Sequence, residues 1–190
     1  MSEPLAAPHV DATKELLGAL RKEGFDFFCG VPCSLLKTLI AEFDRDPSWG
    51  YVSAVREDSA VGLAVGAHMG GKRAAIFMQN SGLGVSVNAL ASLARMYECP
   101  QLLVISWRGE GGDDGVPIGS TSTAGFVDAP EHIQMGVITP RLLELMEIPW
   151  RLLDPKHVAA QLAEVTKVMI KTQRPVALLV RKGIFDGGGH

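Results

Sequence analysis

The sequence predicts a single α/β domain in which helices cover both faces of a parallel sheet. Six short runs of apolar, β-branched or aromatic residues recur along the chain, and helix-patterned stretches lie between them. Three of the runs, AAIFM, LLVIS and VALLV, are apolar throughout, as strands are when both faces of a sheet are covered. We therefore expect a doubly wound sheet of six parallel strands.

The elements follow one another in a regular order. The predicted strands are Phe25–Cys29, Tyr51–Val55, Ala74–Met78, Gln101–Ser106, Trp150–Leu153 and Pro175–Val180. Helix start signals stand at Ser34, Asp58 and Pro155. The stretch from Trp107 to about Val137 shows neither pattern, and an irregular segment of this length is usually functional or mobile.

Composition limits the classes of function. The formal net charge of −3 provides no basic footprint for nucleic acid or an anionic membrane, so small molecules or proteins are the expected partners. Cys29, Cys33 and Cys99 are an odd number without CxxC spacing, which argues against a disulfide framework or a zinc site. The N-terminus has no signal-peptide pattern, and we expect a soluble cytoplasmic protein.

Ligands of a doubly wound sheet bind outside the carboxyl ends of its strands, so the residues after each strand are the candidates. These are Gly30-Val31-Pro32-Cys33-Ser34, Arg56-Glu57-Asp58, Asn80-Ser81-Gly82-Leu83-Gly84 and Trp107-Arg108-Gly109. The first is either a plain turn capped by Ser34 or a pocket wall that presents Cys33 and Ser34. The third is a glycine-bearing turn that matches neither GxGxxG nor a Walker loop.

Glu57 has two interpretations. It belongs either to a solvated charge cluster at a helix start, or to the floor of the crevice, where its carboxyl group exchanges a proton with a ligand nitrogen.

The helix that follows Glu57 is rich in glycine, which disfavours a helix by about 1 kcal/mol per residue relative to alanine. Close packing on its own sheet or a subunit interface would compensate. In Asp128-Ala129-Pro130-Glu131-His132, the histidine is either solvated, or it binds an anionic substrate or moves a proton.

Five segments form a wider pattern: GVPCS, VREDSAVGLAVGAHMGGKRAAIFMQNSGLG, SVNALASL, WRGE and DAPEHIQMGVITPRLLELMEIPW. In this order they resemble phosphonopyruvate decarboxylase and its relative sulfopyruvate decarboxylase, which are thiamine diphosphate enzymes. The resemblance covers residues 10–183 and implies the flavodoxin-like pyrimidine-binding domain of such enzymes. Residues 1–9 and 184–190 are then expected to be a flexible N-terminus and tail.

The resemblance also implies roles for single residues. Glu57 matches the glutamate that hydrogen-bonds N1′ of the cofactor's aminopyrimidine and so promotes deprotonation of its thiazolium C2. The residues that match cofactor-binding positions are Val31, Pro32, Asn80, Ser81 and Gly82. Those expected to face the substrate are Cys33, Ser34, Arg108 and His132, the last two as donors to a phosphonate or carboxylate. We also expect residues 109–127 to close over the substrate.

Family enzymes hold Mg²⁺ through a Gly-Asp-Gly motif followed by an asparagine on a separate domain. Asn80 and Asn88 are the only asparagines in the chain, so this motif is absent. The resemblance then implies the α subunit of a split decarboxylase, whose β subunit binds Mg²⁺ and the diphosphate. A hetero-oligomer is expected, with a homodimer as the alternative for the isolated chain.

WRGE, D-x-P-x-H, ITP and EIPW favour phosphonopyruvate as substrate and phosphonoacetaldehyde as product. Three alternatives stay open. They are a sulfopyruvate decarboxylase α subunit, a non-catalytic binding or regulatory subunit, and a stand-alone flavodoxin-like nucleotide binder.

Overall fold

Six parallel strands form one sheet in the order β2-β1-β3-β4-β6-β5. The structure is a computed structural model that describes residues 11–110 and 128–185. The strands are β1 Phe27–Gly30, β2 Val52–Ser53, β3 Ala74–Gln79, β4 Gln101–Ser106, β5 Trp150–Leu152 and β6 Val176–Val180. The predicted sheet of six parallel strands is confirmed. Phe25, predicted to begin the first strand, instead donates its backbone N–H to the Leu20 carbonyl in the turn that ends the first helix.

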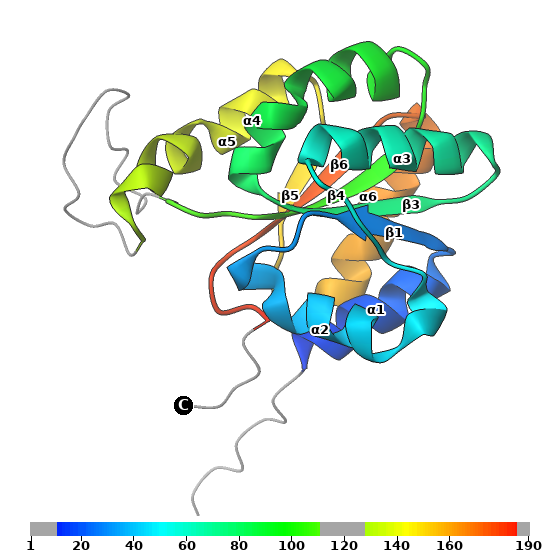
Figure 1. Cartoon of the computed structure of the whole chain (residues 1–190), viewed down its shortest axis with the longest axis horizontal. Coiled ribbons are helices and arrows are strands. Elements are labelled where there is room, and N and C mark those ends of the chain that lie inside the picture. The colour runs from blue at the N-terminus through cyan, green and yellow to red at the C-terminus, as the bar shows by residue number, and fades with distance from the viewer. Residues whose placement is uncertain (1–10, 111–127, 186–190) are drawn as a thin grey trace, which may run out of the picture.

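Helices cover both faces of the sheet, as Figure 1 shows. The helices α1 Ala12–Lys22, α2 Lys37–Arg45 and α6 Val158–Thr172 pack on one face, and α3 Glu57–Met69, α4 Asn80–Ala89 and α5 Ile133–Leu145 pack on the other. Side chains of one strand alternate between two separate cores, because Phe77 belongs to the first and Ile76 to the second. The uniformly apolar strands follow from this double coverage.

The strand order creates one switch point. Strand β1 pairs with β2 on one side and with β3 on the other. The chain therefore runs from β1 toward one edge of the sheet and from β3 toward the opposite edge. A doubly wound sheet opens a ligand crevice at the carboxyl ends of such neighbours. The residues after β1 and β3 therefore flank the expected binding site.

Several boundaries differ from the sequence expectation. Helix α3 begins at Glu57 with Arg56 as its N-cap, α6 begins at Val158, and α5 begins at Ile133, inside the stretch expected to be irregular. The side chain of Phe185 is 2% exposed and packs in the core, so the packed domain extends beyond the boundary expected at residue 183. The segment expected to close over the substrate lies, from residue 111 to residue 127, outside the described residues.

Within the described parts of the chain, no helix is long and apolar enough to cross a membrane. All three cysteines are free.

Candidate active site

Glu57 lies in the first turn of α3, at the carboxyl edge of the sheet. Its neighbours Arg56 and Asp58 form a two-point ion pair, with Arg56 Nε and Nη2 at 3.1 and 2.8 Å from the Asp58 carboxylate oxygens. This pairing lowers the pKa of Asp58 and raises that of Arg56. The half-buried carboxylate of Glu57 makes no hydrogen bond or ion pair with any described residue. The two adjacent acids thus differ, and only Glu57 keeps its carboxylate available to a ligand.

The carboxyl group of Glu57 lies against Gly82, in the first turn of α4. A Cβ atom at Gly82 would stand 2.5 Å from Cδ of Glu57 and 2.6 Å from its Oε1. The residues predicted to form a glycine-bearing turn before a helix instead form the first turn of α4, which begins at Asn80 directly after β3. First turns of helices carry a partial positive charge, so α3 and α4 both favour a carboxylate at this place.

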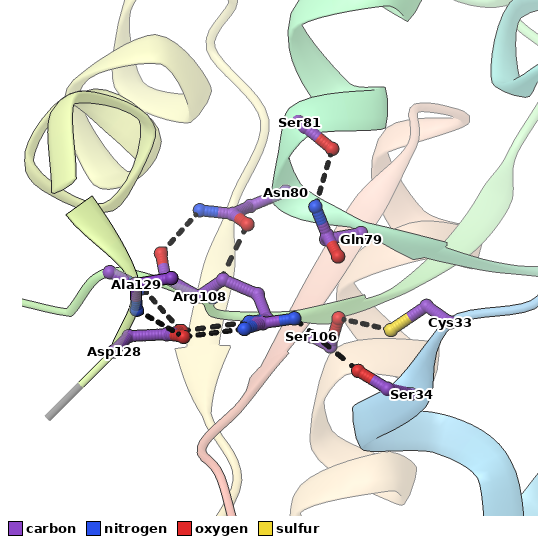
Figure 2. A network of polar contacts seen from close by, with 10 residues as sticks. Cys33, Ser34, Gln79, Asn80, Ser81, Ser106, Arg108, Asp128 and Ala129 are labelled. Atoms are coloured by element: carbon purple, nitrogen blue, oxygen red, sulfur yellow. Dashed lines mark hydrogen bonds and ion pairs between the residues drawn. The ribbon is translucent and has the colours of Figure 1, made fainter. Parts of the chain in front are cut away.

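Cys33 and Ser34 follow β1 and reach toward β4. The thiol of Cys33 lies 2.9 Å from the hydroxyl of Ser106, the last residue of β4. The hydroxyl of Ser34 accepts a hydrogen bond from Arg108 Nη1 at 3.3 Å, so it does not cap the following helix as the plain-turn interpretation required. Both side chains join the network drawn in Figure 2. Cys29 lies outside this network, and complete burial raises the pKa of its thiol to about 12.

Arg108 is held by Asp128 through two parallel hydrogen bonds, of 2.8 Å from Nε and 2.5 Å from Nη2 (Figure 2). The side chains are 20% and 13% exposed. The guanidinium holds the pKa of Asp128 well below its usual range, and the carboxylate raises the pKa of Arg108. Asp128 also accepts hydrogen bonds from the backbone N–H groups of Gly109 and Ala129. The charge predicted to bind a substrate anion is therefore already balanced inside the protein.

Asn80 is completely buried and holds the backbone of Arg108. Its amide nitrogen donates to the Arg108 carbonyl at 2.9 Å and to the Thr139 hydroxyl at 3.0 Å, and its oxygen accepts from the Arg108 N–H at 3.2 Å. The amide thus joins the start of α4, the residues after β4 and helix α5. We infer a scaffold role for Asn80, where the family resemblance implied contact with a cofactor.

We expect Asn80→Ala to lower the free energy of unfolding by about 2–3 kcal/mol, because it leaves buried polar groups of Arg108 and Thr139 without partners. Urea unfolding of the full chain measures the change. The matched control is Asn88→Ala, at the only other asparagine, which is exposed and accepts one hydrogen bond from Ser92. That control should change the free energy by less than about 0.5 kcal/mol. Equal effects of the two substitutions would contradict the scaffold role.

The remaining predicted residues lie around this network. Val31 and Pro32 follow the end of β1, where Val31 is half-buried and Pro32 is exposed. The Ser81 hydroxyl accepts a hydrogen bond from the side-chain amide of Gln79 at 2.7 Å. His132 precedes α5, and its backbone carbonyl lies so close to Gly109 that a side chain at Gly109 would overlap with it. The structure brings His132 to the Arg108 end of the site through its backbone.

Sequence reasoning missed three residues that complete the network: Asp128, Ser106 and Thr139. Asp128 stands in the DAPEH motif, in which only His132 is assigned a ligand role from the sequence. Ser106 ends an otherwise apolar strand, and this change in polarity at the carboxyl edge is the signal that could have found it. Thr139 lies inside a helix and has no such signal. Between residues 11 and 110 and between 128 and 185, no three His, Cys, Asp or Glu side chains lie close enough together to hold a metal ion.

Comparisons with known proteins show the family to which the chain belongs. Residues 10–127 match the family model for the thiamine pyrophosphate enzyme N-terminal TPP binding domain. The chain belongs to the thiamine pyrophosphate enzymes. The sulfopyruvate decarboxylase subunit alpha of Methanothermobacter thermautotrophicus is 37% identical over 90% of this chain and 96% of its own length. The phosphonopyruvate decarboxylase of Streptomyces viridochromogenes is 32% identical over 90% of this chain but only 40% of its own length.

Within the thiamine pyrophosphate enzymes, the chain therefore belongs to the family of sulfopyruvate and phosphonopyruvate decarboxylases. A solved structure of a putative thiamin diphosphate-dependent enzyme from Mycobacterium smegmatis superimposes with a TM-score of 0.67. It is 19% identical and matches 92% of this chain and 31% of its own, and this likeness shows the shared fold. The preference for the phosphonopyruvate branch is not supported, because the sulfopyruvate relative is more identical and matches over nearly its full length.

Proposed function

We propose that the chain is the α subunit of a split thiamine diphosphate-dependent sulfopyruvate decarboxylase, which releases CO₂ and leaves sulfoacetaldehyde. The observation that carries the proposal is the half-buried Glu57 carboxylate, which has no partner among the described residues and lies at the switch point of the sheet. Relatives of matching length bear the name subunit alpha, which supports a partner chain.

Two features of the site fit the aminopyrimidine of the cofactor. The carboxylate of Glu57, which has no partner among the described residues, offers a hydrogen-bonding group for a ring nitrogen, and the missing side chain at Gly82 leaves the room that this carboxylate occupies. Val31 and Pro32 would border the ring from the end of β1. Thiamine diphosphate, when bound, supplies the electron sink for loss of CO₂ from a 2-oxo acid. Glu57 would hold and move a proton at its carboxylate oxygens.

The partner subunit would supply what this chain lacks. We propose that the β subunit holds Mg²⁺ and the diphosphate, as the family's division between two domains implies. The contact surface would include α3, whose Gly62 and Gly66 face open space. That face belongs to an apolar groove of about 700 Å³, which includes Val55 and Leu63. An exposed apolar groove beside the catalytic carboxylate suits a subunit contact.

The substrate choice follows the relatives and agrees with the charges. A sulfonate carries a single negative charge, whereas a phosphonate carries up to two. Because Arg108 already pairs with Asp128, the network offers hydrogen-bond donors with little excess positive charge. Such a site suits the singly charged sulfonate better than a doubly charged phosphonate. The Ser34 hydroxyl and the Cys33 thiol lie between this pair and β1, where a 2-oxo acid would approach.

The test is decarboxylation by the reconstituted complex with thiamine diphosphate and Mg²⁺. We expect turnover only when both subunits are present, with kcat/KM at least about tenfold higher for sulfopyruvate than for phosphonopyruvate, a difference worth about 1.4 kcal/mol. Each subunit alone serves as the control. A reversed preference would favour phosphonopyruvate, which the 32% identical relative supports as the second candidate. An assembled complex without turnover of either acid would favour a non-catalytic role.

A further inference from the structure

Gly82 differs from the other helical glycines near the site in what surrounds it. It is buried in the first turn of α4, and the atoms that crowd its missing Cβ are those of the Glu57 side chain. By contrast, a Cβ at Gly84 would lie 3.3 Å from the terminal methyl group of Met135, and Gly62 and Gly66 have nothing within 4 Å. Gly82 is thus the helical glycine whose absent side chain leaves room for the carboxylate.

We propose that Gly82 is a positioning residue for Glu57: the absence of a side chain there sets where the carboxyl group lies between the first turns of α3 and α4. The proposal rests on the proposed function, in which Glu57 handles the proton. It assigns to Gly82 an action through Glu57, in place of the cofactor contact that the family resemblance implied.

The atoms in conflict decide what a side chain at this position would move. The nearest contact is with Cγ, and the next are with Cδ at 2.5 Å and Oε1 at 2.6 Å, the outer part of a flexible side chain whose carboxylate no described residue holds. Carbon atoms pack at about 3.5–4.0 Å, so an added methyl group would displace Cγ and the carboxyl group of Glu57 by roughly 1 Å or more. The backbone of α4 can stay in place, because alanine favours a helix more than glycine does. The Glu57 carboxylate therefore absorbs the change.

The experiment compares Gly82→Ala with the matched control Gly84→Ala in the reconstituted complex. A displacement of about 1 Å in a reacting group costs on the order of 10²-fold, so we expect Gly82→Ala to lower kcat by roughly 10- to 100-fold and to weaken thiamine diphosphate binding several-fold. Both variants should keep the Tm of the full chain. Gly84→Ala should keep kcat and the cofactor Kd within about twofold.

A double-mutant cycle shows whether Gly82 acts through Glu57. In the Glu57→Gln background, we expect Gly82→Ala to change kcat and the cofactor Kd by less than about threefold, because the group it displaces no longer exchanges the proton. Equal losses in both backgrounds would overturn the proposal, as would a Gly82→Ala complex that behaves like Gly84→Ala or a Gly82→Ala chain that fails to fold. Full activity of Glu57→Gln by itself would instead refute the proposed function of Glu57.

Discussion

Glu57→Gln is expected to lower kcat of the reconstituted complex by about 10²- to 10⁴-fold, the range that proton transfer by a positioned side chain contributes. Glutamine fills the same volume but cannot exchange the proton. The carboxylate of Glu57 has no hydrogen bond to any described residue, so the free energy of unfolding should change by less than about 0.5 kcal/mol. Steady-state turnover and urea unfolding of the same preparation measure both quantities.

Asp58→Asn is the matched control, because Asp58 is the adjacent acid in the same helical turn. Its carboxylate already pairs with Arg56 on the surface. We expect the control to change kcat by no more than about twofold, since surface ion pairs have little influence on a neighbouring site. If Glu57→Gln kept turnover within the range of this control, Glu57 would not be the residue that moves the proton.

The second large effect is expected at the ion pair of Arg108 and Asp128. Asp128→Ala leaves a mostly buried guanidinium without its counter-charge, and it removes the acceptor of the Gly109 and Ala129 N–H groups. Removing one partner of a buried pair costs 3–5 kcal/mol, and partial exposure puts this pair at the lower end, about 3 kcal/mol. Urea unfolding of the full chain at pH 7 measures the loss.

Glu164→Ala is the control for this prediction. Glu164 pairs with Arg151 at 2.9 Å, but both side chains are more than half exposed. Its loss should cost less than about 1 kcal/mol. A loss at Asp128 as small as the loss at Glu164 would show that solvent screens the Arg108 pair as fully as a surface pair.

The ion pair of Arg108 and Asp128 also predicts how the free energy of unfolding depends on pH. Arg108 holds the pKa of Asp128 below its value in the unfolded chain, which is about 3.9. A lowered pKa stabilises the fold above the unfolded pKa, and this stability is lost as the pH falls toward the folded pKa. Between neutral pH and about pH 4, the difference in unfolding free energy between the natural chain and Asp128→Ala should stay constant.

Below about pH 4, that difference should shrink. Other acids with lowered pKa values, such as Asp11, Asp46 and Asp154, contribute equally to both proteins and cancel in the comparison. Urea titrations of the two proteins at a series of pH values provide the measurement. A difference that stayed constant to the lowest accessible pH would show that the charge of Asp128 contributes nothing to the pair.

The sequence determined the fold class and the edge of the sheet at which the site lies. All six strands were predicted from apolar runs, because local hydrophobic patterning decides which segments form a buried sheet. The parallel arrangement then directs the ends of β1 and β3 to one crevice. The same strand-end pattern made Glu57 a candidate with two interpretations, and the family resemblance implied its role in proton transfer.

Only the tertiary structure decided how these residues are used. Arg56 pairs with Asp58, and Glu57 keeps no partner among the described residues. Asn80 holds the backbone of Arg108, 28 residues away, and Arg108 pairs with Asp128 across part of the stretch without a helix or strand pattern. Each choice depends on distances between residues that are remote in sequence or that compete as neighbours, and no local pattern contains those distances. The sequence thus supplied the chemical groups, and packing between strands and helices determined which of them remain available for catalysis.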